Sequence, residues 1–329
     1  MKKLVAIIIG GTGQFGITIS KKLLKKKYQI IITTRSKKKQ KDLTARLPKI
    51  KFECLDIYSK SKITKIIKKY DPNIIFYFAG QSSPRLSFIK KGETHKSNFI
   101  GCKNILEVLK KESINSKFLN MTSSEMYGKI NGKIKLSSPK KPLNPYGKAK
   151  LLSFNLVKKF REQHNLSTYN AIIFNTESFL TKKNYLIPKI CLSAIKAYKF
   201  NTKTTFYNTL VAREWNWCEE QCEFLIRFIQ KKPQDFILSN GKVYSVSEML
   251  YFAFNYFKLD YLKFINTDRK YLKKNEIKIK TSHYSYSLKK NNIKRKPKIY
   301  GKKIIELMIK YYLNEKKYYF IFKILSLYT

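Results

Sequence analysis

The first half of the chain alternates short apolar runs with amphipathic stretches. This alternation is typical of a parallel β-sheet whose strands are joined by crossover helices. The second half is less regular, but the apolar run 236–239 is expected to return as one more strand of that sheet. The pattern therefore predicts a doubly wound α/β fold. The predicted strands are 4–9, 29–34, 51–55, 74–78, 118–121 and 169–174, and the clearest predicted helices are 59–69, 93–111 and 145–164.

A glycine-rich turn follows the first predicted strand. In GGTGQFG, Gly10, Gly13 and Gly16 are spaced by three, and a helix is predicted from Gln14. Glycines at this spacing let the backbone turn tightly, approach a pyrophosphate and pack a helix against a strand. The start of the helix offers unpaired N–H groups to phosphates. The order of strand, turn and helix favours dinucleotide binding by a Rossmann-type domain over an ordinary turn.

The end of the second predicted strand bears on the choice of cofactor. An acidic residue there would bind the 2′-hydroxyl of NAD, but the chain reads TTRSKKK. Arg35 could pair with a 2′-phosphate, which favours NADP; the alternative is a solvated basic loop. We expect residues 1–175 to form an NADP-binding domain, joined by the 236–239 strand. Residues 176–329 are expected to form mainly a smaller C-terminal substrate-binding domain.

The formal net charge of +48 is the unusual bulk property. Such a charge often indicates nucleic acid or an anionic membrane as a partner. Only 8 of the 69 basic residues are Arg, which leaves 61 Lys spread along nearly the whole chain, whereas nucleic-acid readers more often concentrate Arg and aromatic side chains on one face. We therefore predict no specific nucleic-acid partner. A function for the charge, and for the basic aromatic tail 316–329, stays open.

Cysteine usage and the start of the chain bear on location. Five cysteines without metal-ligand spacing and only three histidines predict a reduced, cytoplasmic protein with no structural metal. The start, MKKLVAIIIGG, imitates a signal peptide, but its apolar run is short and no small-residue cleavage site follows, so we interpret it as a buried strand. No window approaches the roughly 18 apolar residues of a membrane span.

Two further motifs carry candidate chemistry. MTSSEMYG places Glu125 among hydroxyl side chains directly after a predicted strand, and NPYGKAK places Tyr146 and Lys150 four residues apart on one helix face. A nearby ammonium lowers the pKa of a phenol, which would let Tyr146 take a proton from a sugar hydroxyl. The spacing alone is weak, because six Tyr residues have a Lys four positions later. Only Tyr146 opens a helix shortly after a strand that ends in hydroxyl groups.

With these motifs the chain resembles the extended short-chain dehydrogenases/reductases, and among them the GDP-mannose 4,6-dehydratases. The resemblance runs from about residue 4 to about residue 313, through GGTGQFG, FAGQSSPRLSF, TSSEMYG, NPYGKAK, FNTES, AREW and ILSNGKVYSV. It implies a nucleotide-sugar hydro-lyase of deoxysugar biosynthesis that is a dimer or tetramer. In such enzymes GDP-mannose is oxidised transiently at carbon 4, loses water across carbons 5 and 6, and receives the hydride back at carbon 6.

The resemblance also implies roles for individual residues. Tyr146 and Lys150 match the catalytic pair, and Glu125 matches the acid that removes the carbon 5 proton and helps expel the carbon 6 hydroxyl. Ser123 matches a Thr that hydrogen-bonds the carbon 4 oxygen. Besides Gly10, Gly13, Gln14, Gly16 and Arg35, which the local pattern already marks as cofactor residues, the resemblance implies Asp56, Ala79, Gly80 and Gln81. The implied substrate residues are Ser82, Asn175, Glu177, Lys189, Arg213, Lys273, which replaces a family Arg, and Glu276.

The chain departs from the family pattern at several positions. The family's Pro-Arg-Arg-Gly after Glu-Ser is replaced by the residues 179–182, FLTK, and Arg-Asp-Trp-Gly is replaced by REWN at 213–216. These departures leave open the oligomeric state, the contacts that bind the cofactor and the identity of the sugar substrate. Another NADP-dependent nucleotide-sugar reductase, epimerase or decarboxylase is the alternative function. A non-catalytic NADP-binding or nucleic-acid-binding protein is the alternative from a different class.

Overall fold

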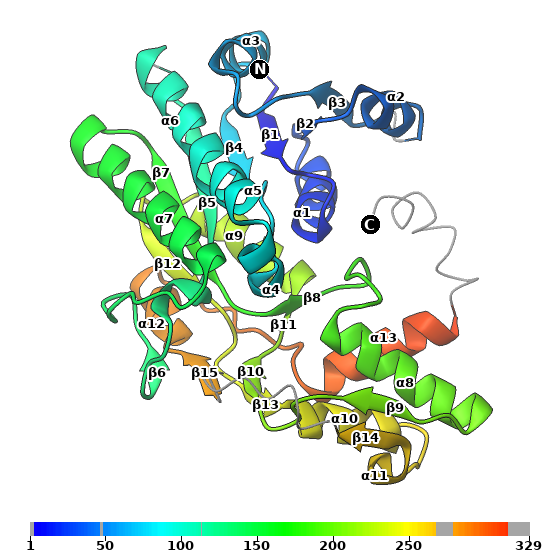
Figure 1. Ribbon diagram of the computed structural model, residues 1–329. Coiled ribbons are helices and arrows are strands. Elements are labelled where there is room, and N and C mark those ends of the chain that lie inside the picture. Colours follow the sequence, from blue (N-terminus) through cyan, green and yellow to red (C-terminus); the bar gives the residue numbers. More distant parts are fainter. Residues whose placement is uncertain (1–2, 47–48, 113, 268–278, 315–329) are drawn as a thin grey trace.

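The structure, a computed structural model, describes residues 3–46, 49–112, 114–267 and 279–314. A seven-stranded parallel sheet forms its centre, in the order β3–β2–β1–β4–β5–β7–β12 (Figure 1). Every strand predicted in the first half is present, with its ends shifted by at most two residues. The strands are β1 (Val5–Ile9), β2 (Gln29–Thr34), β3 (Lys51–Cys54), β4 (Ile74–Tyr77), β5 (Lys117–Ser123), β7 (Thr168–Ile173) and β12 (Asp235–Leu238).

Helices cover both faces of this sheet, as a doubly wound fold requires (Figure 1). On one face, α3 (Lys60–Tyr70), α6 (Gly101–Lys111) and α7 (Pro145–His164) pack against alternate β1 residues such as Ile7. On the other face, α1 (Gln14–Lys25) and α9 (Cys218–Phe228) pack against the β1 residues between them. Because both faces are covered, β1 is a continuous apolar run with all five residues buried. The predicted fold class is confirmed.

The helix predicted at 93–111 is interrupted by a π-helical turn. The structure divides this stretch into α5 (Lys91–His95), the π-helical turn η1 (Lys96–Ile100) and α6, and α4 (Pro84–Ile89) precedes them. Side chains bond back into the turn: Ser97 Oγ donates to the Glu93 carbonyl at 2.7 Å, and Asn98 Nδ2 donates to the Thr94 carbonyl at 2.9 Å. Such turns often occur at functional sites.

The late strand β12 pairs in parallel with β7 at the edge of the sheet. A buried polar chain accompanies this pairing. Asn120 Nδ2 donates to Asn170 Oδ1 at 3.0 Å, and Asn170 Nδ2 donates to Asp235 Oδ1 at 2.9 Å. Arg161 also donates to that carboxylate, at 2.8 Å. A shift of register would leave these buried groups unpaired, which specifies the pairing of β5, β7 and β12.

The second half builds a separate apolar cluster around α8 (Leu186–Phe200), α10 (Val246–Asn255) and α13 (Lys302–Leu313). A second sheet has four strands, in the order β13 (Val243–Ser245), β10 (Ala212–Glu214), β15 (Ile279–Ser282) and β6 (Lys133–Ile134). The remaining elements are α2 (Lys37–Arg46), the 3-10 turn η2 (Ser124–Tyr127), β8 (Thr176–Glu177), β9 (Thr204–Phe206), β11 (Asn216–Trp217), α11 (Tyr261–Phe264), β14 (Ile265–Thr267) and α12 (Tyr284–Lys290).

The division into two domains at residue 175 stays a prediction. Lys273, Glu276 and the tail 316–329 lie outside the described residues. Among the helices that are described, none combines the length and the apolar character needed to cross a bilayer.

Candidate active site

A cleft of about 880 Å³ lies where β1, β2, β4 and β5 end. The carboxyl ends of parallel strands are where doubly wound folds bind ligands. Asp56 adjoins the cleft, because Leu55, Ile57 and Tyr58 line it and the Asp56 carboxylate accepts from the Tyr58 amide at 3.0 Å. The predicted site residues that line the cleft are Gly10, Gly13, Gln14, Gly16, Arg35, Ala79, Gly80, Gln81, Ser82, Tyr146 and Lys150.

Two of the three spaced glycines are required by close backbone contacts. Gly10 has φ of +75°, and a Cβ there would lie 2.5 Å from the backbone of Ala79. A Cβ at Gly16 would lie 2.3 Å from the Cα of Gly11. Gly13, directly before α1, would meet only a carbonyl oxygen at 4.0 Å. The turn is therefore built tightly, while the start of α1 stays open to the cleft.

Gln14 links the glycine turn to the segment that follows β7. Its Nε2 donates to the Thr176 carbonyl at 3.1 Å, and its Oε1 accepts from Ser178 Oγ at 2.7 Å and from Thr181 Oγ1 at 3.2 Å. Leu180, Thr181 and Lys182, in the stretch that departs from the family pattern, line the cleft. The divergent stretch is therefore a wall of the predicted cofactor site, and Gln14 anchors it.

Tyr146 and Lys150 lie in the first turns of α7. The Asn144 side chain caps this helix by accepting from the Gly147 amide at 2.8 Å. Lys150 Nζ donates to the Met121 carbonyl at 2.7 Å and lies 5.8 Å from the centre of the Tyr146 ring. Both side chains are buried.

The expected lowering of the Tyr146 pKa by Lys150 is not seen in this structure. Burial raises the pKa of Tyr146, a hydrogen bond with Ser123 lowers it only in part, and the charge of Glu125 raises it further. Burial also lowers the pKa of Lys150, to about 8. Desolvation therefore outweighs the attraction between ammonium and phenolate, because both groups are buried.

Ser123 connects the phenol to the acidic residue. Its hydroxyl hydrogen-bonds Tyr146 and accepts from the Glu125 amide at 3.2 Å. Glu125 lies in η2, the turn that follows β5. The start of α7 packs closely against this turn, because a Cβ at Gly147 would lie 2.5 Å from the Glu125 carbonyl oxygen. The local fold thus brings Ser123, Glu125 and Tyr146 together, although Ser123 and Glu125 do not line the large cleft itself.

The Glu125 carboxylate has two side-chain donors. Asn144 Nδ2 donates at 2.8 Å to Oε2, and Lys280 Nζ forms a short ion pair with Oε1. Burial raises the pKa of Glu125, but the charge and hydrogen bond of Lys280, the hydrogen bond of Asn144 and the charge of Arg213 lower it more, so the net pKa is below its ordinary value. The acid is therefore ionised at neutral pH.

Lys280 is the functional candidate that sequence reasoning missed. It lies on β15, opposite Arg213 of β10, and is separated from Glu125 by 155 positions in the chain. No local pattern marks a single Lys among 61, so only the packing of β15 against η2 reveals it. Arg213, predicted as a substrate residue, is close enough for its charge to act on Glu125.

Asn175, Glu177, Lys189 and Arg213 do not line the large cleft. Glu177 is 5% exposed, and its Oε2 has no hydrogen-bond partner among the described residues. Burial raises its pKa to about 8, against a lowering by a Thr181 hydrogen bond. Lys189 donates to the Thr205 carbonyl at 2.7 Å and lies over the Phe206 ring. Asn175 is exposed.

Two further cleft residues were not predicted. Tyr185 lines the cleft and is close enough to Tyr146 for its charge to affect the pKa of that phenol. Asn98, on the π-helical turn, also lines the cleft, and its buried Oδ1 has no partner within the described part of the chain. The sequence pattern of 93–111 gave no sign of the π-helical turn, and so it gave no reason to single out Asn98.

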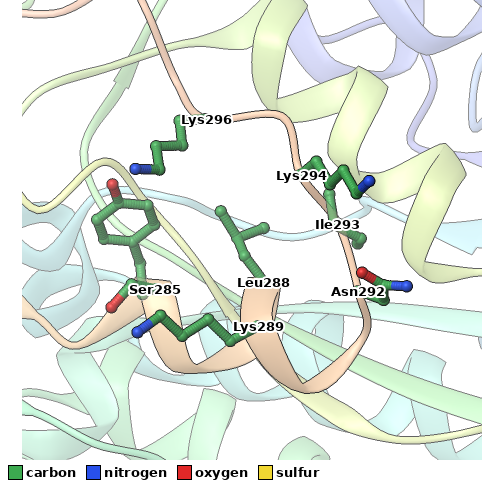
Figure 2. Close-up of a pocket in the computed structure, with 8 residues that line it drawn as sticks. Ser285, Leu288, Lys289, Asn292, Ile293, Lys294 and Lys296 are labelled. Carbon is green, nitrogen blue, oxygen red and sulfur yellow. The ribbon is translucent and has the colours of Figure 1, made fainter.

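A second hollow, of about 460 Å³, lies between α12 and the segment after it (Figure 2). Leu288 and Ile293 form its apolar floor, and Lys289, Lys294 and Lys296 surround it. None of the predicted site residues lines it. Because Lys is abundant throughout the chain, three exposed lysines around a hollow do not single it out as a binding site.

Comparison with known sequences gives one consistent family. The family model for GDP-mannose 4,6 dehydratase matches residues 7–298. The GDP-mannose 4,6 dehydratase of Homo sapiens is 31% identical over 261 residues, which cover 75% of this chain and 70% of the human protein. The Vibrio cholerae GDP-mannose 4,6-dehydratase is 27% identical over 264 residues, covering 76% and 71% of the two chains.

Solved structures agree on the fold. The dTDP-glucose 4,6-dehydratase of Bacillus anthracis, in complex with NAD, has a TM-score of 0.80 at 18% identity and covers 95% of this chain and 98% of its own. RMD from Pseudomonas aeruginosa, complexed with NADPH, has a TM-score of 0.78 at 15% identity, with 94% and 98% covered. The match to the family model and the 31% identity to the human protein establish that the chain belongs to the GDP-mannose 4,6 dehydratase family.

Proposed function

We propose that the protein is a hydro-lyase that converts GDP-mannose to GDP-4-keto-6-deoxymannose with NADP as its cofactor. The observation that carries the proposal is the joining of Tyr146 and Glu125 through Ser123. The hydroxyl of Ser123 bonds the phenol and the amide of Glu125, and the Glu125 carboxylate acts electrostatically on the phenol. This arrangement supports a base for a hydroxyl proton and a base for a carbon-bound proton that act on one sugar ring.

The glycine turn and Arg35 are the residues that would hold the cofactor. Gly10 and Gly16 lack side chains at points where neighbouring backbone segments come very close. The start of α1 faces the cleft, and this arrangement suits a pyrophosphate. Arg35 lines the cleft just after β2, which suits a 2′-phosphate and favours NADP over NAD. When bound, the nicotinamide would accept the hydride from carbon 4 and return it to carbon 6.

Tyr146 would take the proton of the carbon 4 hydroxyl while the hydride leaves the same carbon. Ser123, already hydrogen-bonded to Tyr146, would hold the carbon 4 oxygen. The ammonium of Lys150, on the same helix, supplies a positive charge 5.8 Å from the centre of the Tyr146 ring. That charge would favour the tyrosinate and so oppose the burial that raises the pKa of Tyr146.

Glu125 would then act on carbon 5. The ketone at carbon 4 makes the carbon 5 proton acidic, and the ionised carboxylate accepts it. The double bond between carbons 5 and 6 forms as the bond from carbon 6 to its hydroxyl breaks, and the Glu125 proton leaves with that hydroxyl as water. A hydride at carbon 6 and a proton at carbon 5 complete the product, so the reaction has no net change in redox state.

The homo-oligomer implied by the family resemblance is part of this proposal. Leu86, Ile89 and Leu152 are exposed on α4 and α7 and supply apolar surface that a second copy could cover. Light scattering at several protein concentrations measures the assembly state. A strict monomer at every concentration would contradict this part of the proposal.

The function is tested by incubating the purified protein with GDP-mannose and NADP and measuring product mass. We expect a product lighter by one water that carries a carbonyl at carbon 4, and no product with Tyr146→Phe. Tyr286→Phe is the matched control, because Tyr286 is an exposed tyrosine that does not line the cleft. Unchanged GDP-mannose, together with turnover of another sugar nucleotide, would replace the proposal with a related reductase, epimerase or decarboxylase.

A further inference from the structure

Lys280 has an unusual position for a lysine. Its side chain is 1% exposed, and its ammonium faces the carboxylate of Glu125. Removing an ammonium from water costs several kcal/mol unless a partner compensates. Most of the described lysines lie on the surface, whereas Lys280 is buried against Glu125, the predicted base.

The strand that carries Lys280 is held in place by a second buried acid. Glu214 of β10 is fully buried, and its carboxylate accepts from Thr281 Oγ1 at 2.8 Å, from Ser282 Oγ at 3.0 Å and from the Ser282 amide. The same carboxylate accepts from the Gly241 amide at 2.7 Å. The two residues after Lys280 are thus fixed by one carboxylate, which limits how far Lys280 can move.

The charged and polar groups around Glu125 come from three elements. β15 contributes Lys280, β10 contributes Arg213, and α7 contributes the neutral phenol of Tyr146 and, at its cap, the Asn144 amide. Arg213 and Lys280 are neighbours across β10 and β15, and the charge of Arg213 lowers the pKa of Lys280. Lys280 is the only one of these cations for which a direct bond to Glu125 is seen among the described residues.

We propose that Lys280 is a positioning residue for Glu125: it orients the carboxylate through one oxygen, keeps it ionised until the carbon 5 proton arrives, and favours release of that proton. This inference rests on the proposed function, because it takes Glu125 to be the base. Asn144 holds the second oxygen, so the two donors together fix the plane of the carboxylate.

The ion pair between Lys280 and Glu125 affects both proton transfers, the one to Glu125 and the one from it. Before elimination, the carboxylate and the buried ammonium neutralise each other. When Glu125 accepts the carbon 5 proton, the ammonium of Lys280, whose side chain is 1% exposed, loses its counter-charge. That state is unfavourable, so the proton is passed on to the departing carbon 6 hydroxyl, and the ion pair forms again as water leaves.

The coupling can be measured on the protein without substrate. In protein labelled with carbon-13 at the glutamate carboxyl, the Glu125 resonance is identified by its absence in Glu125→Gln, and its titration is followed in wild type, Lys280→Met and Lys280→Arg. We expect the Glu125 titration to move to higher pH in Lys280→Met and to return toward wild type in Lys280→Arg. Lys133→Met is the matched control, because Lys133 is an exposed lysine on the neighbouring strand β6.

A kinetic readout separates positioning from a merely structural role. We expect the ratio of kcat at about pH 6 to kcat at about pH 8 to fall severalfold in Lys280→Met, because loss of a close opposite charge raises the pKa of a carboxyl group by about 1–3. The KM for GDP-mannose should change less than about twofold, since Lys280 is buried behind Glu125. If Lys280→Met does not fold, Lys280→Gln, which is polar and neutral, carries the same expectation.

The two proposals fail in different ways. If Glu125 titrates identically in wild type, Lys280→Met and Lys280→Gln, the role of Lys280 is refuted whatever the enzyme turns over. If the titration moves as expected but wild type does not dehydrate GDP-mannose, the proposed function is wrong while the electrostatic coupling stands. A loss of activity in Lys280→Met that is equal at all pH values, with unchanged titration, would assign Lys280 a structural role only.

Discussion

Lys150 should destabilise the fold at neutral pH, because its ammonium is buried. Burial lowers its pKa from the ordinary 10.5 to about 8, which corresponds to about 3 kcal/mol. Between these two pH values the unfolded chain holds the proton and the folded chain does not, so stability rises with pH across that window. The full cost is therefore present below about pH 8 and vanishes above about pH 10.5.

Lys150→Met removes this cost and fills similar space. It also loses the hydrogen bond to the Met121 carbonyl, worth about 1 kcal/mol, but that loss is the same at every pH. We predict that the unfolding free energy of Lys150→Met minus that of wild type is larger by about 3 kcal/mol at about pH 7.5 than at about pH 10.5, while dehydratase activity is lost.

Urea denaturation at several pH values measures this difference. The matched control is Lys148→Met, because Lys148 is an exposed lysine on the same helix; its difference from wild type should not vary with pH over this window. A difference for Lys150→Met that stays constant from about pH 7.5 to about pH 10.5 would refute the reasoning, since it would mean that Lys150 titrates alike in the folded and unfolded chain.

Further predictions concern the glycine turn, the cofactor phosphate and the acid that holds β15. Gly10→Ala should lower the unfolding free energy by about 1–3 kcal/mol and abolish NADP binding, because φ is +75° and the new Cβ would meet the Ala79 backbone at 2.5 Å; denaturation and calorimetry measure both, and normal NADP affinity would contradict the expectation. Arg35→Ala should weaken NADP binding about tenfold or more and leave NAD binding nearly unchanged, since an ion pair to the 2′-phosphate is lost; an equal effect on both cofactors would argue against a 2′-phosphate contact. Glu214→Gln should destabilise the protein by about 3 kcal/mol or more, because several buried donors lose a charged acceptor; wild-type stability in denaturant would show that the bonds to Glu214 contribute little.

The strands and the opening of α7 were predictable because their signals are local. Uninterrupted apolar runs specify buried parallel strands, and Asn144 followed by Pro145 is a strong helix start. The glycine turn was predictable for the same reason: its spacing reports backbone needs within one strand, one turn and one helix. The hydroxyl cluster at the end of β5 likewise pointed to Glu125, while the family resemblance pointed to Ser123.

The environment of Glu125 was not predictable, because it depends on tertiary contacts. Lys280 reaches Glu125 only after β15 is placed beside β10 by the Glu214 carboxylate. The pKa of Tyr146 could not be read from its spacing to Lys150 either, because that spacing says nothing about burial, which is the largest cause of the shift. The π-helical turn that places the buried Asn98 in the wall of the cleft interrupts a helix whose periodicity looked regular.

The central claim is that Glu125 removes the proton from carbon 5 after Tyr146 has allowed oxidation at carbon 4. The most direct measurement is to mix Glu125→Gln with NADP and GDP-mannose in deuterated water and analyse the sugar. We predict reduced nicotinamide and a sugar oxidised at carbon 4 that keeps its carbon 6 hydroxyl and has no deuterium at carbon 5, whereas wild type gives a dehydrated product with deuterium at carbon 5. Dehydration by Glu125→Gln at the wild-type rate would contradict the account.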